Sequence, residues 1–210
     1  LMLPFLDALN RAQAAQAREM LAGLYEHTDW VAERALAKAP FQSLAHLKWA
    51  LSSAVREASS DEKRALICAH PELAGRAALA GELTEASRQE QSRSGLQACS
   101  PEEFEAFHAL NQAYRERFGW PFILAIGGPR GNGLGRAEIL STWRRRLEMA
   151  HDLEEAECLR QVHRIAELRL NQRAGFDPID GAVVWDWCEA LAQFSEDDAR
   201  ARGQLTVSYL

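Results

Sequence analysis

The sequence predicts an all-α fold: a single compact multi-helix domain with a C-terminal helical appendage. Apolar residues recur at helical spacing along most of the chain, and short breaks at Pro40, Pro71, Ser100 and Gly119 separate the helical segments. The 210 residues are 47% hydrophobic, which is enough to bury one substantial core, or one core plus an appendage. No second strand is available to pair with the single extended run, and this excludes a parallel sheet.

The expected helices begin at recognisable signals. Ser59 and Glu62 have the spacing of a capping box, and Ser100, Pro101 and Glu103 combine an N-cap, a proline at the first helical position and a capping glutamate. Aromatic residues then recur on one face, as in a buried core: Phe104, Phe107, Tyr114 and Phe118. The segments with helical spacing are 4–22, 28–38, 43–57, 60–69, 84–97, 101–118, 136–150 and 152–171.

The composition changes after Leu170, where the stretch NQRAGFDPIDG brings two glycines, a proline and two aspartates. Such clusters are typical of linkers. We therefore expect a main domain over residues 1–172, a linker over 173–181 and an appendage over 182–210.

The overall charge excludes some partners. The net charge of -6, with a pI near 5.6 and no dense Lys/Arg block, argues against a nucleic-acid-binding surface. The densest basic run, RRR at 144–146, falls within a helical pattern and is interpreted as a solvated face. No apolar stretch reaches transmembrane length, and the chain start lacks the features of a signal peptide. A cytoplasmic protein without nucleic-acid or membrane partners is expected.

The cysteines and histidines show no metal-ligand spacing. The histidines lack H-E-x-x-H or a comparable pattern, so no metal site is expected. No C-x-x-C pair is present, and reduced thiols are the simplest interpretation of the four isolated cysteines: Cys68, Cys99, Cys158 and Cys188.

The helix expected over 60–69 has to stop at His70, because Pro71 disfavours helical geometry in the residue before it. A helix C-terminus favours positive charge by roughly 0.3–1 kcal/mol, so a protonated imidazole is expected there. On this ground the expected His70 pKa lies above its usual ~6.5. A solvated histidine that caps loose carbonyls is the alternative, and this pattern alone leaves both open.

The segment TEASRQEQSRSG, residues 84–95, is almost entirely polar, with Ala86 its only clearly apolar residue. As a helix it either lies largely in solvent or lines a polar cavity. Hydroxyl, carboxylate and amide groups would project from one face, at positions i, i+3, i+4 and i+7: Ser87, Glu90, Gln91 and Ser94.

Arg169 falls on the apolar stripe of the last strong helix, which also carries Val162, Ile165 and Ala166. A buried guanidinium is costly unless it meets an anion, so this position predicts a carboxylate or a ligand anion close by. An arginine that reaches out to solvent near the helix end is the alternative.

The stretch FGWPFILAIGGPRGNGLG, residues 118–135, is an apolar run that leads into a glycine-rich loop and then a helix. It lacks the G-K-[ST] of a P-loop, and Gly131, Gly133 and Gly135 do not form G-x-G-x-x-G. A nucleotide site is therefore disfavoured. We interpret the stretch as an extended segment with free backbone N–H and C=O groups beside a cavity.

Taken together, these blocks resemble the 2-oxo-4-hydroxy-4-carboxy-5-ureidoimidazoline (OHCU) decarboxylase family of urate degradation, over roughly residues 3–171. In chain order they are YEHTDWVAERAL, APF, HPELAG, S-x-x-E-Q at 87–91, FGWPFILA and RIAELRL. The resemblance implies an all-helical fold of the OHCU decarboxylase type and a homodimer. It also implies cofactor-independent decarboxylation of the small molecule OHCU to (S)-allantoin.

The resemblance further implies a site. His70 matches the family's catalytic histidine, and Glu90 matches its carboxylate partner. Such a partner is expected to raise the His70 pKa further. Loss of CO₂ leaves electrons that delocalise into an adjacent C=N group, so no metal or electron-sink cofactor is required. The remaining matches are substrate-contacting positions: Pro71, Ser87, Gln91, Arg169 and the backbone-presenting segment Phe122, Ile123, Leu124, Ala125 and Ile126.

Two other classes of function stay open. A non-catalytic helical interaction module would use the polar 84–95 helix as a docking face, and a ligand sensor would keep the pocket without turnover. The intact set of His70, Glu90 and Arg169 favours the enzyme. A docking surface needs neither an arginine on a core stripe nor a histidine at a helix break.

The tail WDWCEALAQFSEDDARARGQLTVSYL resembles the opening helix of allantoate amidohydrolases, metal-dependent enzymes further down the same pathway. The appendage over 182–210 is therefore expected to be either the start of a fused second enzyme domain, with metal ligands beyond Leu210, or a decorative helix.

Overall fold

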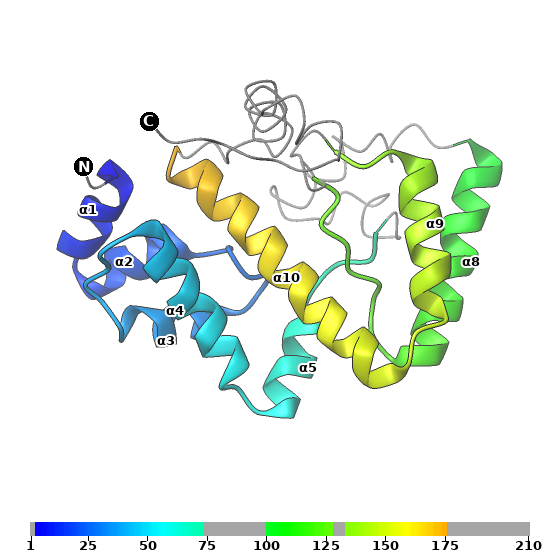
Figure 1. Cartoon of the computed structure of the whole chain (residues 1–210), viewed down its shortest axis with the longest axis horizontal. Coiled ribbons are helices and arrows are strands. Elements are labelled where there is room, and N and C mark those ends of the chain that lie inside the picture. The colour runs from blue at the N-terminus through cyan, green and yellow to red at the C-terminus, as the bar shows by residue number, and fades with distance from the viewer. Residues whose placement is uncertain (1–2, 74–99, 128–132, 176–210) are drawn as a thin grey trace, which may run out of the picture.

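The computed structural model describes residues 3–73, 100–127 and 133–175. Every regular element within these ranges is a helix (Figure 1), which confirms the predicted all-α fold. The helix expected over 84–97 and the appendage over 182–210 lie outside the described residues. The described helices are α1 (Pro4–Arg11), α2 (Ala14–Leu21), α3 (Asp29–Leu36), α4 (Leu44–Arg56), α5 (Ser60–Cys68), α8 (Pro101–Phe118), α9 (Arg136–Leu147) and α10 (His151–Arg173).

The long helix α10 joins two groups of helices. Figure 1 shows α1 to α4 gathered near its C-terminal half, and α8 and α9 near its N-terminal end. Within these groups α3 packs on α4 and α8 packs on α9, while α5 contacts α10 directly. Side chains along α10 can therefore meet residues from both groups, and this arrangement positions the site described below.

The predicted helix over 4–22 is wrong as a single element. Ala12 and Gln13 adopt extended backbone, which ends α1 and starts α2 in a new direction. The break has a packing reason, because one continuous helix would carry a single buried stripe, whereas each short helix turns its own apolar residues into the core. The buried residues are Leu6 and Leu9 on α1, and Ala17 and Leu21 on α2.

The predicted helix starts are confirmed. The Ser59 side chain accepts from the Glu62 N–H at 3.2 Å, and the Glu62 carboxylate accepts from the Ser59 N–H at 2.9 Å. Ser100 and Glu103 form the same reciprocal box at the start of α8. Gly119 ends α8 with a left-handed φ of 82°, a conformation that glycine adopts without a steric penalty.

The aromatic core lies between α8, α9 and the segment after α8. Phe107, Tyr114 and Phe118 are buried as predicted, whereas Phe104 is only half-buried. Phe122 stacks on Trp143, with ring centroids 4.2 Å apart and planes 9° from parallel. Burial of such large side chains contributes about 1.5–3 kcal/mol each relative to leaving them exposed. This packing anchors the segment that begins at Phe122.

The basic run at 144–146 is only partly a solvated face. Arg144 and Arg145 are exposed as predicted, but Arg146 is 1% exposed, so the prediction is wrong for that residue. Its Nη2 and Nε donate to Glu154 Oε1 at 2.5 and 2.9 Å. The Tyr114 hydroxyl donates to the same carboxylate oxygen. Arg146 points inward because a buried carboxylate on α10 needs a cation.

Two of the four cysteines lie within the described residues. Cys68 and Cys158 are free, and burial raises the pKa of the Cys158 thiol to about 11, so it stays protonated near neutral pH. Cys99 and Cys188 lie outside the described residues. Of the helices in the described ranges, none combines the length and the apolar character needed to cross a membrane.

Candidate active site

His70 follows α5 directly and is buried, with 8% of its surface exposed. Its Nδ1 lies 3.0 Å from the Leu66 carbonyl, in the last turn of α5. A carbonyl only accepts hydrogen bonds, so Nδ1 carries the hydrogen and Nε2 of the neutral ring is an acceptor. The alternative interpretation was therefore right that His70 caps a carbonyl and wrong that it is solvated.

The expected rise in the His70 pKa is wrong. Burial lowers the pKa to about 4, because a charged imidazole loses its hydration. The hydrogen bond to Leu66 and the charge of Glu26 act in the opposite direction, and Arg169 and His27 lower the pKa further. The advantage of a helix C-terminus, roughly 0.3–1 kcal/mol, is too small to offset desolvation. His70 is therefore neutral near pH 7.

Arg169 is buried on α10, and it meets an anion supplied by the protein. Its Nη1 donates to Glu26 Oε2 at 2.7 Å and to the Gly23 carbonyl at 3.1 Å. Arg169 is 6% exposed and Glu26 is 2% exposed, so the guanidinium does not reach out to solvent. The prediction of a nearby anion is confirmed, and the solvent-reaching alternative is wrong.

Glu26 was not singled out in the sequence. It lies in the loop between α2 and α3, within the YEHTDWVAERAL block that carried part of the resemblance. Thr28 Oγ1 donates to the Glu26 carbonyl at 2.6 Å, and Gly23 and His27 take left-handed φ values of 70° and 47°. A single acidic residue in a loop belongs to no helical pattern, so the sequence contained no signal for it. Only the fold brings Glu26 to Arg169.

The segment Phe122, Ile123, Leu124, Ala125 and Ile126 is buried throughout and lies between α8 and α9. The Ala125 N–H donates to Gln161 Oε1 at 2.9 Å, and the Ile123 carbonyl accepts from Arg146 Nη1 at 2.6 Å. Among the described residues, the N–H and C=O groups of Leu124 make no hydrogen bond. The segment thus keeps free backbone groups at Leu124, whereas other groups in it are bonded within the protein, and its place beside a cavity stays a prediction.

The glycine-rich stretch after Ile126 is closed at its base. The Leu134 N–H donates to the Ile126 carbonyl at 2.8 Å, and the Gly133 N–H donates to the Gly127 carbonyl at 2.9 Å. Gly133 has a φ of 90°, which a residue with a Cβ rarely adopts. The segment that ends at Ile126 is thus held at both ends.

Gln161 is a second residue that sequence reasoning missed. Its side chain is held by Glu157, which accepts from Nε2 at 2.7 Å while Oε1 faces Ala125. Gln161, Ile165 and Arg169 follow one another at intervals of four, so they lie along one face of α10. The sequence signal that could have identified Gln161 is its position as a polar residue at the far end of the apolar stripe. One helix face therefore holds both the 122–126 segment and the Glu26 loop.

Of the other predicted site residues, Pro71 can be placed and three cannot. Ser87, Glu90 and Gln91 fall in the range 74–99, outside the described residues, whereas Pro71 follows His70 and is half-buried. In the parts of the chain that the structure describes, no three histidine, cysteine, aspartate or glutamate side chains group to hold a metal ion.

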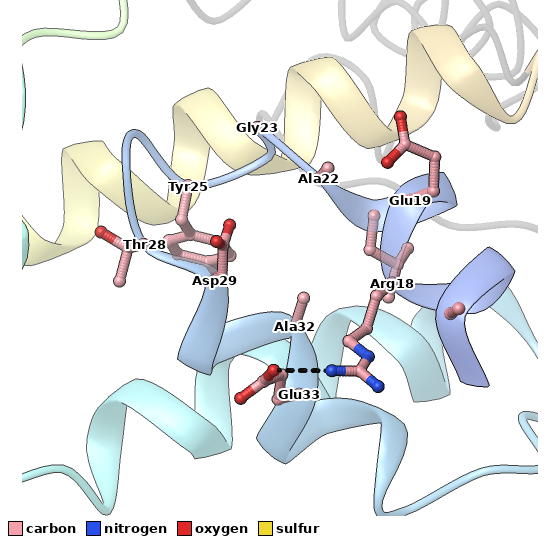
Figure 2. Close-up of a pocket in the computed structure, with 11 residues that line it drawn as sticks. Arg18, Glu19, Ala22, Gly23, Tyr25, Thr28, Asp29, Ala32 and Glu33 are labelled. Carbon is pink, nitrogen blue, oxygen red and sulfur yellow. Dashed lines mark hydrogen bonds and ion pairs between the residues drawn. The ribbon is translucent and has the colours of Figure 1, made fainter.

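A cavity of about 420 Å³ opens beside the Glu26 loop (Figure 2). It is lined by α2, α3 and loop residues that include Gly23, Tyr25 and Thr28, and it is crossed by the Arg18–Glu33 ion pair at 3.2 Å. Neither His70 nor Arg169 lines it. We therefore assign the candidate site from the buried cluster of His70, Arg169 and Glu26 rather than from this cavity.

The fold and the cluster together define an all-α protein with a buried candidate site, in which a neutral imidazole is influenced by the charges of an arginine–carboxylate pair. Comparison with known families gives the particular class: residues 10–171 match the family described as OHCU decarboxylase. The chain belongs to the OHCU decarboxylase family, which confirms the resemblance inferred from its motifs.

Relatives with assigned names agree. The chain is 37% identical over 168 residues to the 2-oxo-4-hydroxy-4-carboxy-5-ureidoimidazoline decarboxylase of Haloferax volcanii, covering 80% of this chain and 95% of that protein. It is 33% identical over 165 residues to the uric acid degradation bifunctional protein PucL of Bacillus subtilis, covering 79% of this chain but only 32% of that protein.

Two solved structures are similar. A crystal structure of (S)-allantoin synthase superposes with a TM-score of 0.60 at 30% identity, covering 80% of this chain and 53% of that one. A crystal structure of OHCU decarboxylase in the presence of (S)-allantoin superposes with a TM-score of 0.55 at 18% identity, covering 69% and 90%. At that identity the second comparison supports the fold alone.

Proposed function

We propose that this chain is a carboxy-lyase that decarboxylates OHCU to (S)-allantoin in urate degradation, without a cofactor. The observation that carries the proposal is the buried neutral His70, whose Nε2 is an acceptor, in the same electrostatic neighbourhood as Arg169 and Glu26. The family, and the names of relatives that are 32–37% identical over most of the chain, support the same reaction.

The reaction breaks the C–C bond to the carboxylate, and the bonding electrons delocalise into the neighbouring C=N group as CO₂ leaves. A proton is then added to one face of the carbon. His70 and Glu90 are the catalytic residues in this proposal. The substrate is held by Pro71, Ser87, Gln91, Arg169 and the segment Phe122, Ile123, Leu124, Ala125 and Ile126.

The protonation state of His70 sets the order of proton transfers. A neutral imidazole has no proton to give at Nε2. His70 therefore acts first as a base, accepting the proton of the substrate's 4-hydroxyl group as that oxygen becomes a carbonyl, and then as an acid, delivering the proton to the carbon. The Arg169 guanidinium, already paired with Glu26, donates further hydrogen bonds to the substrate anion, and the free backbone groups of Leu124 supply hydrogen bonds to the urea-like part. Holding the reactants in one orientation lowers the barrier further.

The decisive experiment measures which enantiomer of allantoin forms, and how fast. Freshly generated OHCU is mixed with the protein, and product formation is followed by circular dichroism. The enzyme reading predicts that (S)-allantoin accumulates faster than spontaneous decay, which yields racemic product. A ligand sensor would bind OHCU without accelerating its loss, and an interaction module would do neither, so either result would reject the proposal.

The oligomeric state and the cellular compartment belong to the same proposal. We infer a homodimer in the cytoplasm that takes a small-molecule substrate. The expectation that residues 1–172 form the catalytic domain is supported by the family match over 10–171.

Deletion of residues 176–210 is expected to leave decarboxylation within about twofold of the full chain. The reason is that the family match ends at residue 171, before the deleted segment. The measurement is kcat/KM for OHCU, with the thermal midpoint recorded in parallel. A large loss of activity in a folded truncation would place the tail in the catalytic domain, against the proposed boundary.

Replacement of Arg169 by lysine is expected to raise KM or lower kcat by at least about tenfold, with little change in thermal midpoint. Lysine keeps a positive charge toward Glu26 and the Gly23 carbonyl, which both accept from Arg169 Nη1, but it loses the planar guanidinium and its other N–H groups. Steady-state kinetics and thermal unfolding test this. A variant that unfolds, or one with wild-type kinetics, would assign Arg169 a purely structural role.

A further inference from the structure

Glu26 lies at the centre of a loop that is tied to α10 at several points. The Tyr25 hydroxyl lies 2.9 Å from His163 Nδ1, and Arg169 Nη1 donates to the carbonyl of Gly23. The backbone of His27 is held at a φ of 47°, which is uncommon for a residue with a side chain and costs of order 1 kcal/mol. The fold thus accepts local strain to hold the Glu26 side chain in the interior.

The Glu26–Arg169 pair is poorly explained by stability alone. Both residues are at least nine-tenths buried, and an apolar pair of similar volume is often as stable or more so, because two buried charges lose their hydration. A buried pair beside a titratable group is, in contrast, a common arrangement at sites of proton transfer. The position of the pair therefore points to the reaction rather than to the core.

We propose that Glu26 is a positioning residue of the site: its carboxylate holds the guanidinium of Arg169 in place and supplies negative charge to the surroundings of His70. This assignment rests on the proposed function and deepens it. Glu26 acts on the substrate through Arg169 and His70. Because the guanidinium is planar and rigid, fixing its Nη1 against Glu26 also fixes the orientation of the rest of the group toward the anion that Arg169 binds.

Within the described ranges, three charged or titratable groups act electrostatically on His70. Glu26 and His27 come from the loop before α3, and Arg169 comes from α10. Of these, Glu26 favours the protonated imidazole, whereas Arg169 and His27 oppose it. Removal of the Glu26 charge would leave the two opposing groups unbalanced and would make His70 harder to protonate.

The test compares Glu26→Gln and Glu26→Asp with Glu33→Gln. Glu33 is a matched control because it is also a glutamate paired with an arginine, but it is exposed. It lies on α3, the helix that follows the Glu26 loop, and pairs with Arg18 on the surface. Three quantities are measured: the onset of His70 titration by NMR between pH 4 and 8, kcat and KM for OHCU, and the thermal midpoint.

In Glu26→Gln, the onset of His70 protonation is expected at lower pH than in the wild type, and kcat/KM is expected to fall about 10²-fold, because Arg169 loses its fixed geometry. Glu26→Asp keeps the charge but shortens the side chain, so it should keep the His70 onset and raise KM. Glu33→Gln should match the wild type in all three measurements.

A folded Glu26→Gln variant with the wild-type His70 titration and wild-type KM would overturn the proposal. If that variant does not fold, Glu26→Asp decides: wild-type KM in Glu26→Asp overturns the positioning role, and a raised KM supports it. A purely structural Glu26 would lower the thermal midpoint in both variants without moving the His70 titration. Absence of OHCU turnover in the wild type would reject the proposed function, and the NMR titration would still decide the role of Glu26.

Discussion

Replacement of His70 by alanine is expected to lower the stereoselective acceleration by about 10²–10⁴-fold, the usual contribution of a positioned acid–base group. His70 is buried, and its Nδ1 bond to Leu66 leaves Nε2 as an acceptor. Formation of (S)-allantoin from fresh OHCU measures the loss. The matched control is His108→Ala on α8, an exposed histidine, which should keep wild-type activity.

The proposed partnership of His70 with Glu90 adds a test by double mutation. If both residues act on one proton path, the double variant His70→Ala/Glu90→Ala should be little worse than the poorer single variant. Fully additive losses would mean that the two residues serve separate roles. An unchanged activity in His70→Ala would remove the histidine from the mechanism altogether.

The buried neutral state of His70 also predicts a pH dependence of stability. The folded-state pKa, about 4, lies below the usual ~6.5 of an unfolded chain, so between these values the unfolded chain binds the proton more readily. The free energy of unfolding should therefore fall as the pH drops through this window, by roughly 3 kcal/mol at most. In urea unfolding between pH 7 and 4.5, the free energy of unfolding of His70→Gln should fall less steeply than that of the wild type.

Replacement of Arg146 by methionine is expected to destabilise the fold by about 3–5 kcal/mol, because it leaves the buried Glu154 carboxylate without its cation. Arg146 also donates to the Ile123 carbonyl at 2.6 Å, so the 122–126 segment would lose one of its anchors. The free energy of unfolding in urea is the measurement. The double variant Arg146→Met/Glu154→Leu should recover much of the stability, since both charges are then absent.

Arg145→Met is the matched control for this prediction. Arg145 is the neighbour of Arg146 on α9 and is exposed, so its loss should change stability by less than about 0.5 kcal/mol. Equal effects of the two substitutions would show that the Arg146–Glu154 pair contributes no more than an average surface arginine.

Local patterns predicted the helices and their starts, because the information lies within a few residues of each signal. The capping boxes at Ser59 and Ser100 and the left-handed Gly119 are properties of short stretches. The break at Ala12 escaped this reasoning, because the 4–22 segment has helical spacing on both sides. Only the packing of the two halves against a common core separates them.

The sequence by itself determined the all-α class, the end of α5 just before His70 and the need of Arg169 for an anion, because periodicity, proline geometry and the cost of a buried charge act locally. The tertiary structure alone decided which anion that is and how His70 titrates. Glu26 is 143 residues from Arg169 along the chain, and no spacing rule links them. Desolvation of His70 depends on everything packed around it, so burial reversed the pKa direction that the helix end and a carboxylate partner had predicted.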